Sequence, residues 1–222
     1  MAKNKLRRFA ENLLYPNMFQ VPLDELKEHQ FKLKGKWNAD FFKNENPIVL
    51  ELGCGKGEYT IGLAERYPDK NFIGVDIKGA RMWKGCKESN ERQMPNVAFL
   101  RTRIEFINFF FAESEVSEIW VTFPDPQLKK PNKRLTCERM LSLYRQIAIP
   151  TAKYHLKTDS KELYDYTKDE VLFPEKYNIL ASTDDLYASA LFGEVKEIKT
   201  HYEQLFSEKG KKITYLSFEE RR

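Results

Sequence analysis

The chain has 222 residues, of which 41% are hydrophobic and 14% aromatic, so it can bury one sizeable core, whereas two full domains would be cramped. Its formal charge of +4, from 37 basic and 33 acidic residues, is too balanced to indicate a nucleic-acid partner by itself. No apolar run is long enough to span a membrane, and the cysteines and histidines have neither disulfide nor metal-ligand spacing, which excludes a membrane protein and a zinc or disulfide scaffold. We expect a cytoplasmic protein without a bound metal.

The first 40 residues lack a regular strand and helix pattern and are predicted to form an appended N-terminal arm of short helices and turns. The arm begins with MAKNKLRRFA, in which four residues are basic and none is acidic. Because this start has charge but little apolar periodicity, we expect it to be mobile when no partner is bound. Residues 41–222 are predicted to form one domain.

From residue 47 onward, strand and helix patterns alternate. Short β-branched or aromatic runs predict strands at residues 48–52, 71–77, 96–102, 117–123, 152–158, 177–183 and 211–218. Helical periodicity predicts helices at residues 59–67, 80–93, 105–113, 137–149 and 161–172. This alternation is typical of an α/β fold with a doubly wound, mostly parallel sheet. The longest gap between strands, residues 184–211, is expected to carry function on loops or a short helix.

A glycine turn, ELGCGKGEY, follows the first of these strands. Its glycines are Gly53, Gly55 and Gly57. A dinucleotide-binding fingerprint would have its third glycine one place later, where this chain has Glu58. The carboxylates of Glu51 and Glu58 would repel phosphate but suit a ligand with positive charge, such as S-adenosylmethionine. Asp76 ends the next strand, where an acid can accept hydrogen bonds from both hydroxyls of a ribose. Such a turn can also be purely structural, because many turns need positive φ.

A rigid corner follows the strand predicted at 117–123. Asp125 lies between Pro124 and Pro126, and proline fixes its own φ and restricts the residue before it. The carboxyl end of this strand borders the crevice of a doubly wound sheet, so Asp125 can hold a substrate beside a bound donor. Its alternative role is that of a helix cap. The bases that follow, Lys129, Lys130, Lys133 and Arg134, can neutralise phosphates or simply form a solvated face.

Four motifs together carry a family resemblance: ELGCGKGEYTIGLAERYPDKNFIGVDIK, VTFPDPQLKKPNKR, LKTD and THYE. They resemble the bacterial tRNA (guanine-N7)-methyltransferase family over about residues 47–218. The resemblance implies a Rossmann-like class I methyltransferase domain at residues 41–222, with an antiparallel closing strand, behind a helical arm at residues 1–40. It also implies S-adenosylmethionine as cofactor and tRNA as partner, with methylation of a guanosine at N7, at position 46 of the variable loop. The chain is expected to be a monomer or a homodimer.

The resemblance also assigns roles to residues. Cofactor-binding roles are implied for Glu51, Gly53, Gly55, Asp76, Arg103 and Asp125, and the catalytic role for Asp125. Substrate-binding roles are implied for Lys129, Asp159, Thr200, His201, Tyr202 and Glu203. The chain departs from the family at Arg103, where an acid near the adenine is usual, and at Gln127, where the family commonly has tryptophan. Asp159 can instead cap a helix, and THYE can be an ordinary amphipathic turn.

Three other functions remain open from the residues alone. The chain could methylate a different RNA, or it could be an RNA-binding module without activity, although the intact acids Glu51, Asp76 and Asp125 disfavour the second. An NAD-dependent oxidoreductase is disfavoured by the shifted third glycine and the acidic turn.

Overall fold

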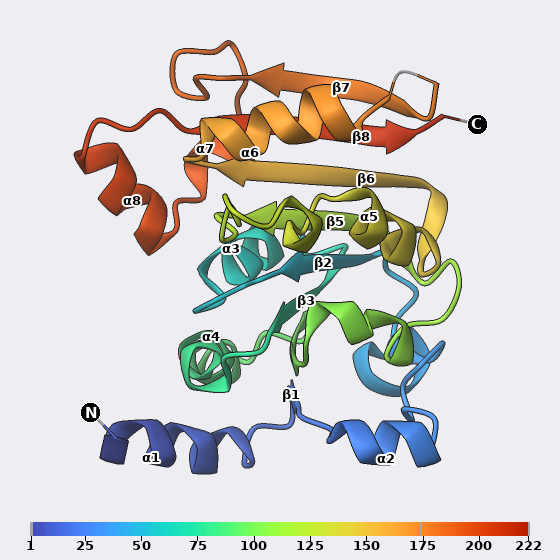
Figure 1. The fold of residues 1–222 in the computed structure, drawn as a ribbon. Coiled ribbons are helices and arrows are strands. Elements are labelled where there is room, and N and C mark those ends of the chain that lie inside the picture. Colours follow the sequence, from blue (N-terminus) through green and yellow to red (C-terminus); the bar gives the residue numbers. More distant parts are fainter. Residues whose placement is uncertain (1, 174, 222) are drawn as a thin grey trace.

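The computed structural model describes residues 2–173 and 175–221, which form an α/β fold on one eight-stranded sheet (Figure 1). The strands are β1 (Met18–Phe19), β2 (Ile48–Leu52), β3 (Asn71–Asp76), β4 (Val97–Arg101), β5 (Val116–Thr122), β6 (Ala148–Thr158), β7 (Tyr177–Thr183) and β8 (Thr214–Glu220). Their order is β1-β4-β3-β2-β5-β6-β8-β7, with parallel pairing from β1 to β6. β8 runs antiparallel to both of its neighbours, β6 and β7. The predicted doubly wound, mostly parallel sheet with an antiparallel closing strand is confirmed.

The strand order reverses at β2. The chain runs outward from β2 through β3 to β4, then returns to place β5 on the other side of β2 and continues to β6. In such sheets a ligand crevice opens at the carboxyl ends of the strands beside this reversal. The segments that leave β2, β3 and β5 at this edge are therefore the ones placed to form a site.

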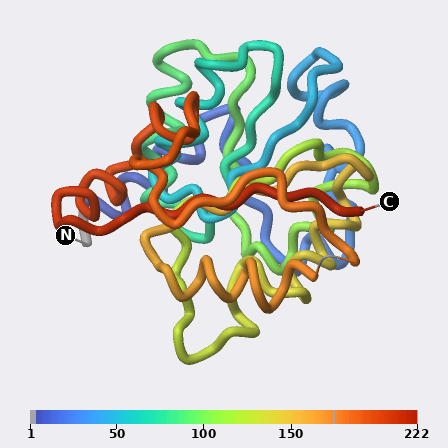
Figure 2. Tube along the Cα trace, turned by 90° about the horizontal axis from the view of Figure 1, so that it is seen from above, coloured from blue at the N-terminus to red at the C-terminus, as the bar shows by residue number. Residues whose placement is uncertain are grey.

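Helices cover both faces of the sheet and define two hydrophobic clusters. On one face lie α3 (Glu58–Arg66) and α4 (Gly79–Glu91), with apolar side chains packed against β2, β3 and β4. On the other face lie η2 (Ile104–Phe109), α5 (Glu138–Arg145), α6 (Lys161–Asp165) and the π-helix η4 (Tyr166–Val171). Figure 2 shows this layering, with β8 in red between the α6 segment in orange and the teal and green segments. β2 and β3 are buried throughout, apart from the partly exposed Asp76, because both of their faces are covered.

The N-terminal segment is integrated with the sheet. It contains α1 (Ala2–Asn12), β1, α2 (Leu23–Glu28) and the π-helix η1 (Trp37–Phe42), and β1 adds to the sheet by pairing with β4. α1 packs on α4, where the buried Asn12 donates its side-chain amide to the carbonyl of Gly79 at 2.9 Å. Arg8 lies 4.8 Å from the ring of Trp83. The basic start was expected to be mobile without a partner, and the structure has residues 2–12 as a helix whose Arg8 and Asn12 contact α4, far away in sequence.

Two predicted helices differ in length and type. The helix predicted at 105–113 is the shorter 3₁₀ helix η2, and the one predicted at 137–149 ends at Arg145. β6 begins at Ala148, which pairs with Val116. The sequence Ile-Ala-Ile-Pro at 147–150 explains this change, since β-branched residues favour strands and proline cannot continue a helix. The gap at 184–211 contains α7 (Glu194–Glu197) and α8 (His201–Glu208).

The described residues contain no helix that is both long and apolar enough to cross a membrane. Among the same residues, no three His, Cys, Asp or Glu side chains are grouped so that they could hold a metal ion. The cysteines, Cys54, Cys86 and Cys137, are buried as free thiols.

Candidate functional site

The glycine turn joins β2 to α3 at the reversal point of the sheet. The backbone N–H of Gly53 donates to the carbonyl of Val75 at 2.8 Å, which fixes the turn to β3. Gly53 has φ +83°, a conformation that side chains disfavour. Gly57 has φ +75°, and a Cβ atom there would lie 2.6 Å from the ring of Phe99. The third glycine is therefore needed for close packing at the start of α3, one position earlier than in the dinucleotide fingerprint.

Glu51, on β2, packs beneath the glycine turn inside the protein. It is only 3% exposed, and its carboxylate accepts hydrogen bonds from the backbone N–H of Thr60 at 2.8 Å and from the hydroxyl of Thr122 at 2.6 Å. Burial raises the pKa of Glu51 to about 7, although the threonine bonds lower it. The structure thus places the Glu51 carboxylate inside the protein, against α3 and β5.

Asp76 joins the turns that follow β2 and β3. One carboxylate oxygen accepts from the backbone N–H of Gly55 at 2.9 Å, and the other accepts from that of Lys78 at 2.8 Å. Each oxygen can accept a further bond. Gly55 is therefore held by Asp76.

A cavity of about 430 Å³, which we call the donor cavity, opens beside Asp76. It is lined by Gly53, Asp76, Ile77, Thr102, Arg103, Ile104, Glu105 and Leu135. Ile77 is 52% exposed, which leaves an apolar surface next to a carboxylate. The exposed guanidinium of Arg103 lies 3.6 Å from the carboxylate of Glu105. Neither Glu51 nor Gly55 is among the lining residues of this cavity.

The Pro-Asp-Pro corner leaves the end of β5. Its flanking residues, Phe123 and Gln127, both have φ +46°, a strained conformation for residues other than glycine. Asp125 is exposed, and one of its carboxylate oxygens accepts the backbone N–H of Gln127 at 3.0 Å. Strain of this kind persists only where the surrounding structure holds it in place.

Arg134 supports the Pro-Asp-Pro corner and, unlike the lysines of the same run, is buried. It is 2% exposed, its Nε donates to the carbonyl of Pro126 at 3.0 Å, and its Nη2 donates to Glu162 at 2.6 Å. Its guanidinium also lies 4.3 Å from the centre of the Tyr166 ring. The prediction that Arg134 faces phosphates was therefore wrong, because contacts with α6 and η4 bury it. Lys129, Lys130 and Lys133 are exposed, as that prediction requires.

A second cavity, of about 480 Å³, which we call the substrate cavity, brings Asp125, Asp159 and Tyr202 together. Its lining also includes Arg81, Phe123, Pro124, Pro126, Leu128, Ser160, Phe206 and Lys211. The carboxylate of Asp159 accepts from Nζ of Lys211 at 2.6 Å. Asp159 directly follows β6, and Asp125 follows β5, so two neighbouring parallel strands deliver both acids to one place.

The tetrapeptide at 200–203 divides between the protein interior and the substrate cavity. Thr200 caps α8, with its hydroxyl accepting the backbone N–H of Glu203 at 3.2 Å. Tyr202 lines the substrate cavity and is 39% exposed. His201 is exposed but does not line this cavity, and its backbone N–H donates to Glu58 at 2.8 Å. Glu203 is fully buried.

Glu203 forms a buried ion pair with Lys157 of β6. Their side chains are 0% exposed, with Nζ and Oε1 2.8 Å apart. The hydroxyl of Tyr187 donates to the same carboxylate at 2.6 Å, and Lys157 donates to the carbonyl of Ile198 at 3.1 Å. Burial lowers the pKa of Lys157, while Glu203 opposes that shift. Sequence reasoning missed Lys157, although a lysine inside a buried strand is itself a signal of a special partner.

Comparisons with known proteins show the family of this chain. Residues 45–216 match the family model described as "Putative methyltransferase". A tRNA (guanine-N(7)-)-methyltransferase of Bacteroides fragilis is 52% identical over 221 residues, which cover 98% of this chain and 86% of the relative. One of Christiangramia forsetii is 51% identical, and the match covers 98% of each chain. The chain belongs to the tRNA (guanine-N(7)-)-methyltransferase family.

Solved structures of methyltransferases share the fold of this chain. The antibiotic-resistance methyltransferase Kmr aligns with a TM-score of 0.60 at 18% identity, covering 92% of this chain and 95% of Kmr. The 16S rRNA methyltransferase KamB aligns with a TM-score of 0.59 at 16% identity, covering 80% of this chain and 89% of KamB. At such identities the likeness concerns the fold alone, and it confirms the predicted fold class.

Proposed function

We propose that the chain transfers the methyl group of S-adenosylmethionine to N7 of a guanosine in tRNA, at position 46 of the variable loop. The main support is the arrangement of two acids around the glycine turn. Asp76 ends β3 and lines the donor cavity, while Asp125 follows β5 and lines the substrate cavity. β2 lies between these strands, so both acids lie at the edge of the sheet beside the reversal point. The family membership supports the reaction, and the motif resemblance supports the position in tRNA.

The donor cavity fits S-adenosylmethionine. Asp76 offers acceptors to the ribose hydroxyls, and the exposed side chain of Ile77 offers an apolar surface to the adenine. Gly53 also lines this cavity, and its φ of +83° is a conformation that residues with a side chain disfavour. When bound, the cofactor supplies an electrophilic methyl group.

The substrate cavity fits a guanine base. N7 of guanine carries a free lone pair, so no protein group has to remove a proton from the nucleophile. The chain contributes by orienting the base, for which the rigidly held carboxylate of Asp125 can accept hydrogen bonds from guanine N–H groups. Tyr202 and Phe206 have stacked rings 6.3 Å apart at the wall of this cavity and provide an aromatic surface for the base. The exposed Lys129 is placed to bind a neighbouring phosphate.

A labelled-methyl assay tests this function. The protein is incubated with the labelled donor and total tRNA, and the nucleosides are then separated. Label is expected in 7-methylguanosine, and it should be lost from a tRNA transcript whose guanosine 46 is replaced by adenosine. Label in another nucleoside would refute the proposed reaction, and tRNA binding without any label would indicate a binding module without activity.

Replacing Asp76 with asparagine should weaken binding of the donor product S-adenosylhomocysteine while leaving tRNA affinity unchanged. Asparagine keeps one of the two oxygens that accept backbone N–H groups and loses the charge that strengthens the ribose bonds, at a cost of about 2 to 3 kcal/mol. Calorimetry measures the donor affinity, and filter binding measures the tRNA affinity. Unchanged affinity for the donor product would remove Asp76 from the proposed site.

Replacing Arg134 with lysine should lower the methylation rate about tenfold or more at saturating tRNA, because lysine cannot bond Pro126 and Glu162 while stacking on Tyr166. The salt dependence of tRNA binding should stay the same, since Arg134 is buried. Lys133→Ala is the matched control, and it should reduce the salt slope by about one unit with little effect on the saturated rate. The reverse pattern would show that Arg134 contacts RNA.

A further inference from the structure

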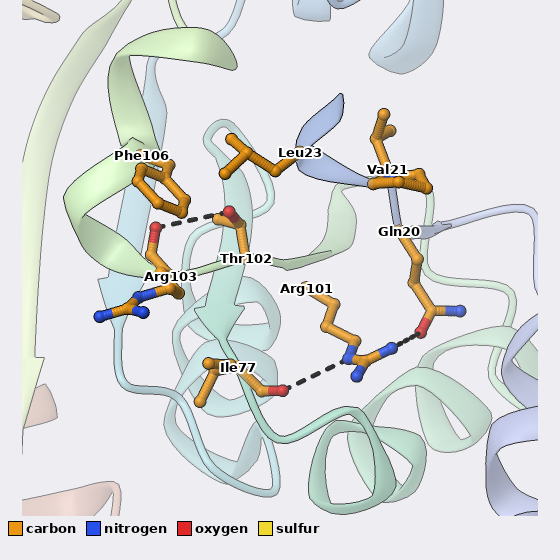
Figure 3. Close-up of a pocket in the computed structure, with 9 residues that line it drawn as sticks. Gln20, Val21, Leu23, Ile77, Arg101, Thr102, Arg103 and Phe106 are labelled. Carbon is orange, nitrogen blue, oxygen red and sulfur yellow. Dashed lines mark hydrogen bonds between the residues drawn. The ribbon is translucent and has the colours of Figure 1, made fainter. Parts of the chain in front are cut away.

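The chain segment between β1 and α2 lies over the far end of the donor cavity. Residues Gln20, Val21, Pro22 and Leu23 line a space of about 470 Å³, together with Ile77, Arg101, Thr102, Arg103 and Phe106 (Figure 3). Ile77, Thr102 and Arg103 also line the donor cavity. The two spaces therefore meet at these three residues, and the N-terminal segment forms the wall of the outer one, which we call the arm chamber.

The wall is held in place on both sides. On one side, Phe19 pairs with Leu100 in the sheet, and its ring contacts Trp37 with the centroids 5.0 Å apart. Asn17 donates its side-chain amide to the carbonyl of Val97 at 3.2 Å. On the other side, Leu26 of α2 is buried in the core. Gln20 thus has a defined position relative to Ile77.

The polar groups of the arm chamber differ in what they can offer a ligand. Arg101 and Arg103 have only hydrogen-bond donors. Arg101 donates from Nε to the carbonyl of Ile77 and from Nη1 to Oε1 of Gln20, both at 3.3 Å, and Oε1 keeps a second lone pair for a ligand. Gln20 has an acceptor and two donors on one carboxamide, and Figure 3 shows this group at the edge of the chamber opposite Phe106.

We propose that the arm chamber is the adenine end of the donor site and that Gln20 binds the amino edge of the adenine. This inference rests on the proposed function. Adenine presents an amino donor beside a ring-nitrogen acceptor, and a carboxamide matches both groups, as it does when Gln or Asn reads adenine in DNA. Val21, Leu23, Ile77 and Phe106 supply apolar surface for the faces of the base. Gln20 thereby takes the role of the acid that is absent at Arg103.

The rival acceptor is Glu105, which lines the donor cavity but not the arm chamber. Its carboxylate lies beside the guanidinium of Arg103, with the nearest atoms 3.6 Å apart. Because Glu105 belongs to η2 and Gln20 to the N-terminal segment, single substitutions separate the two possibilities.

The test pairs protein variants with two ligands, S-adenosylhomocysteine and its analogue without the 6-amino group on the base. Calorimetry on the full chain should show that the wild-type protein binds the amino ligand about tenfold more tightly. Gln20→Leu should bind both ligands equally, which a purely structural role of Gln20 would not produce. Gln20→Glu keeps an acceptor and a partner for Arg101, so it should retain the preference, and Glu105→Gln should retain it as well.

Each outcome decides the inference. A full preference in Gln20→Leu would overturn it, and loss of the preference in Glu105→Gln would assign the contact to Glu105 instead. If the wild-type protein bound neither ligand, the proposed cofactor would be wrong and the inference would fall with it. If Gln20→Leu failed to fold, loss of the preference in Gln20→Glu, or its absence from the wild-type protein, would overturn the inference. A preference retained in both Gln20→Glu and Glu105→Gln would support it.

Discussion

Replacing Asp125 with alanine should lower the single-turnover methylation rate at saturating tRNA by about 100-fold or more. Asp125 is exposed in the substrate cavity on a corner that two prolines, two strained residues and a buried arginine hold in one conformation. Since N7 of guanine needs no deprotonation, orientation of the base is the main contribution that the protein can make. Donor affinity should fall only modestly.

Lys129→Ala provides the matched comparison, four positions along the same loop. Its exposed ammonium is expected to bind phosphate equally in the ground state and the transition state, so the change should weaken tRNA binding and reduce the salt slope by about one unit. Single-turnover rates over a series of tRNA concentrations, at two salt concentrations, separate the two roles. If Asp125→Ala kept the full saturated rate and lost only affinity, the corner would serve binding rather than orientation.

Local sequence patterns predicted the frame of the site. The strand runs, the glycine turn and the positions of Asp76 and Asp125 depend on periodicity and on residues within a few positions of each other. The topology then fixes where strand ends meet, because parallel strands around a reversal point deliver their carboxyl ends to one edge. For this reason Asp125 and Asp76 could be placed near a crevice from the sequence, whereas a site role for Asp159 came only from the motif resemblance.

Long-range contacts were not predictable in the same way. Arg134 belongs to a run of basic residues that is typical of a phosphate-binding loop. Its burial depends on Glu162 and Tyr166, which lie on later helices. Glu51 was assigned to the cofactor, and its hydrogen bonds with Thr60 and Thr122, which come from different elements, could not be predicted from the local sequence. The N-terminal segment has no periodic pattern, so its place on α4 and beside the arm chamber depends on side chains elsewhere in the chain.

The buried pair of Lys157 and Glu203 has the largest expected effect on stability. Replacing Lys157 with methionine leaves the carboxylate of Glu203 buried without a counter-charge, and such a change costs about 3 to 5 kcal/mol of unfolding free energy. Glu203 belongs to α8, which also carries Tyr202 and Phe206 at the substrate cavity. Urea denaturation should therefore show the loss of stability, and the methylation rate should fall because α8 is no longer held in place.

The double variant Lys157→Met with Glu203→Gln shows whether Glu203 acts as an anchor or contacts the substrate, as the motif resemblance implies. It removes both charges and keeps an oxygen for the hydroxyl of Tyr187, so it should recover most of the lost stability. If Glu203 only anchors α8, the methylation rate should recover together with the stability. If the double variant is stable but its rate at saturating tRNA stays low, the Glu203 carboxylate acts on the substrate. If the single variant Lys157→Met is as stable as the wild type, the ion pair does not hold α8.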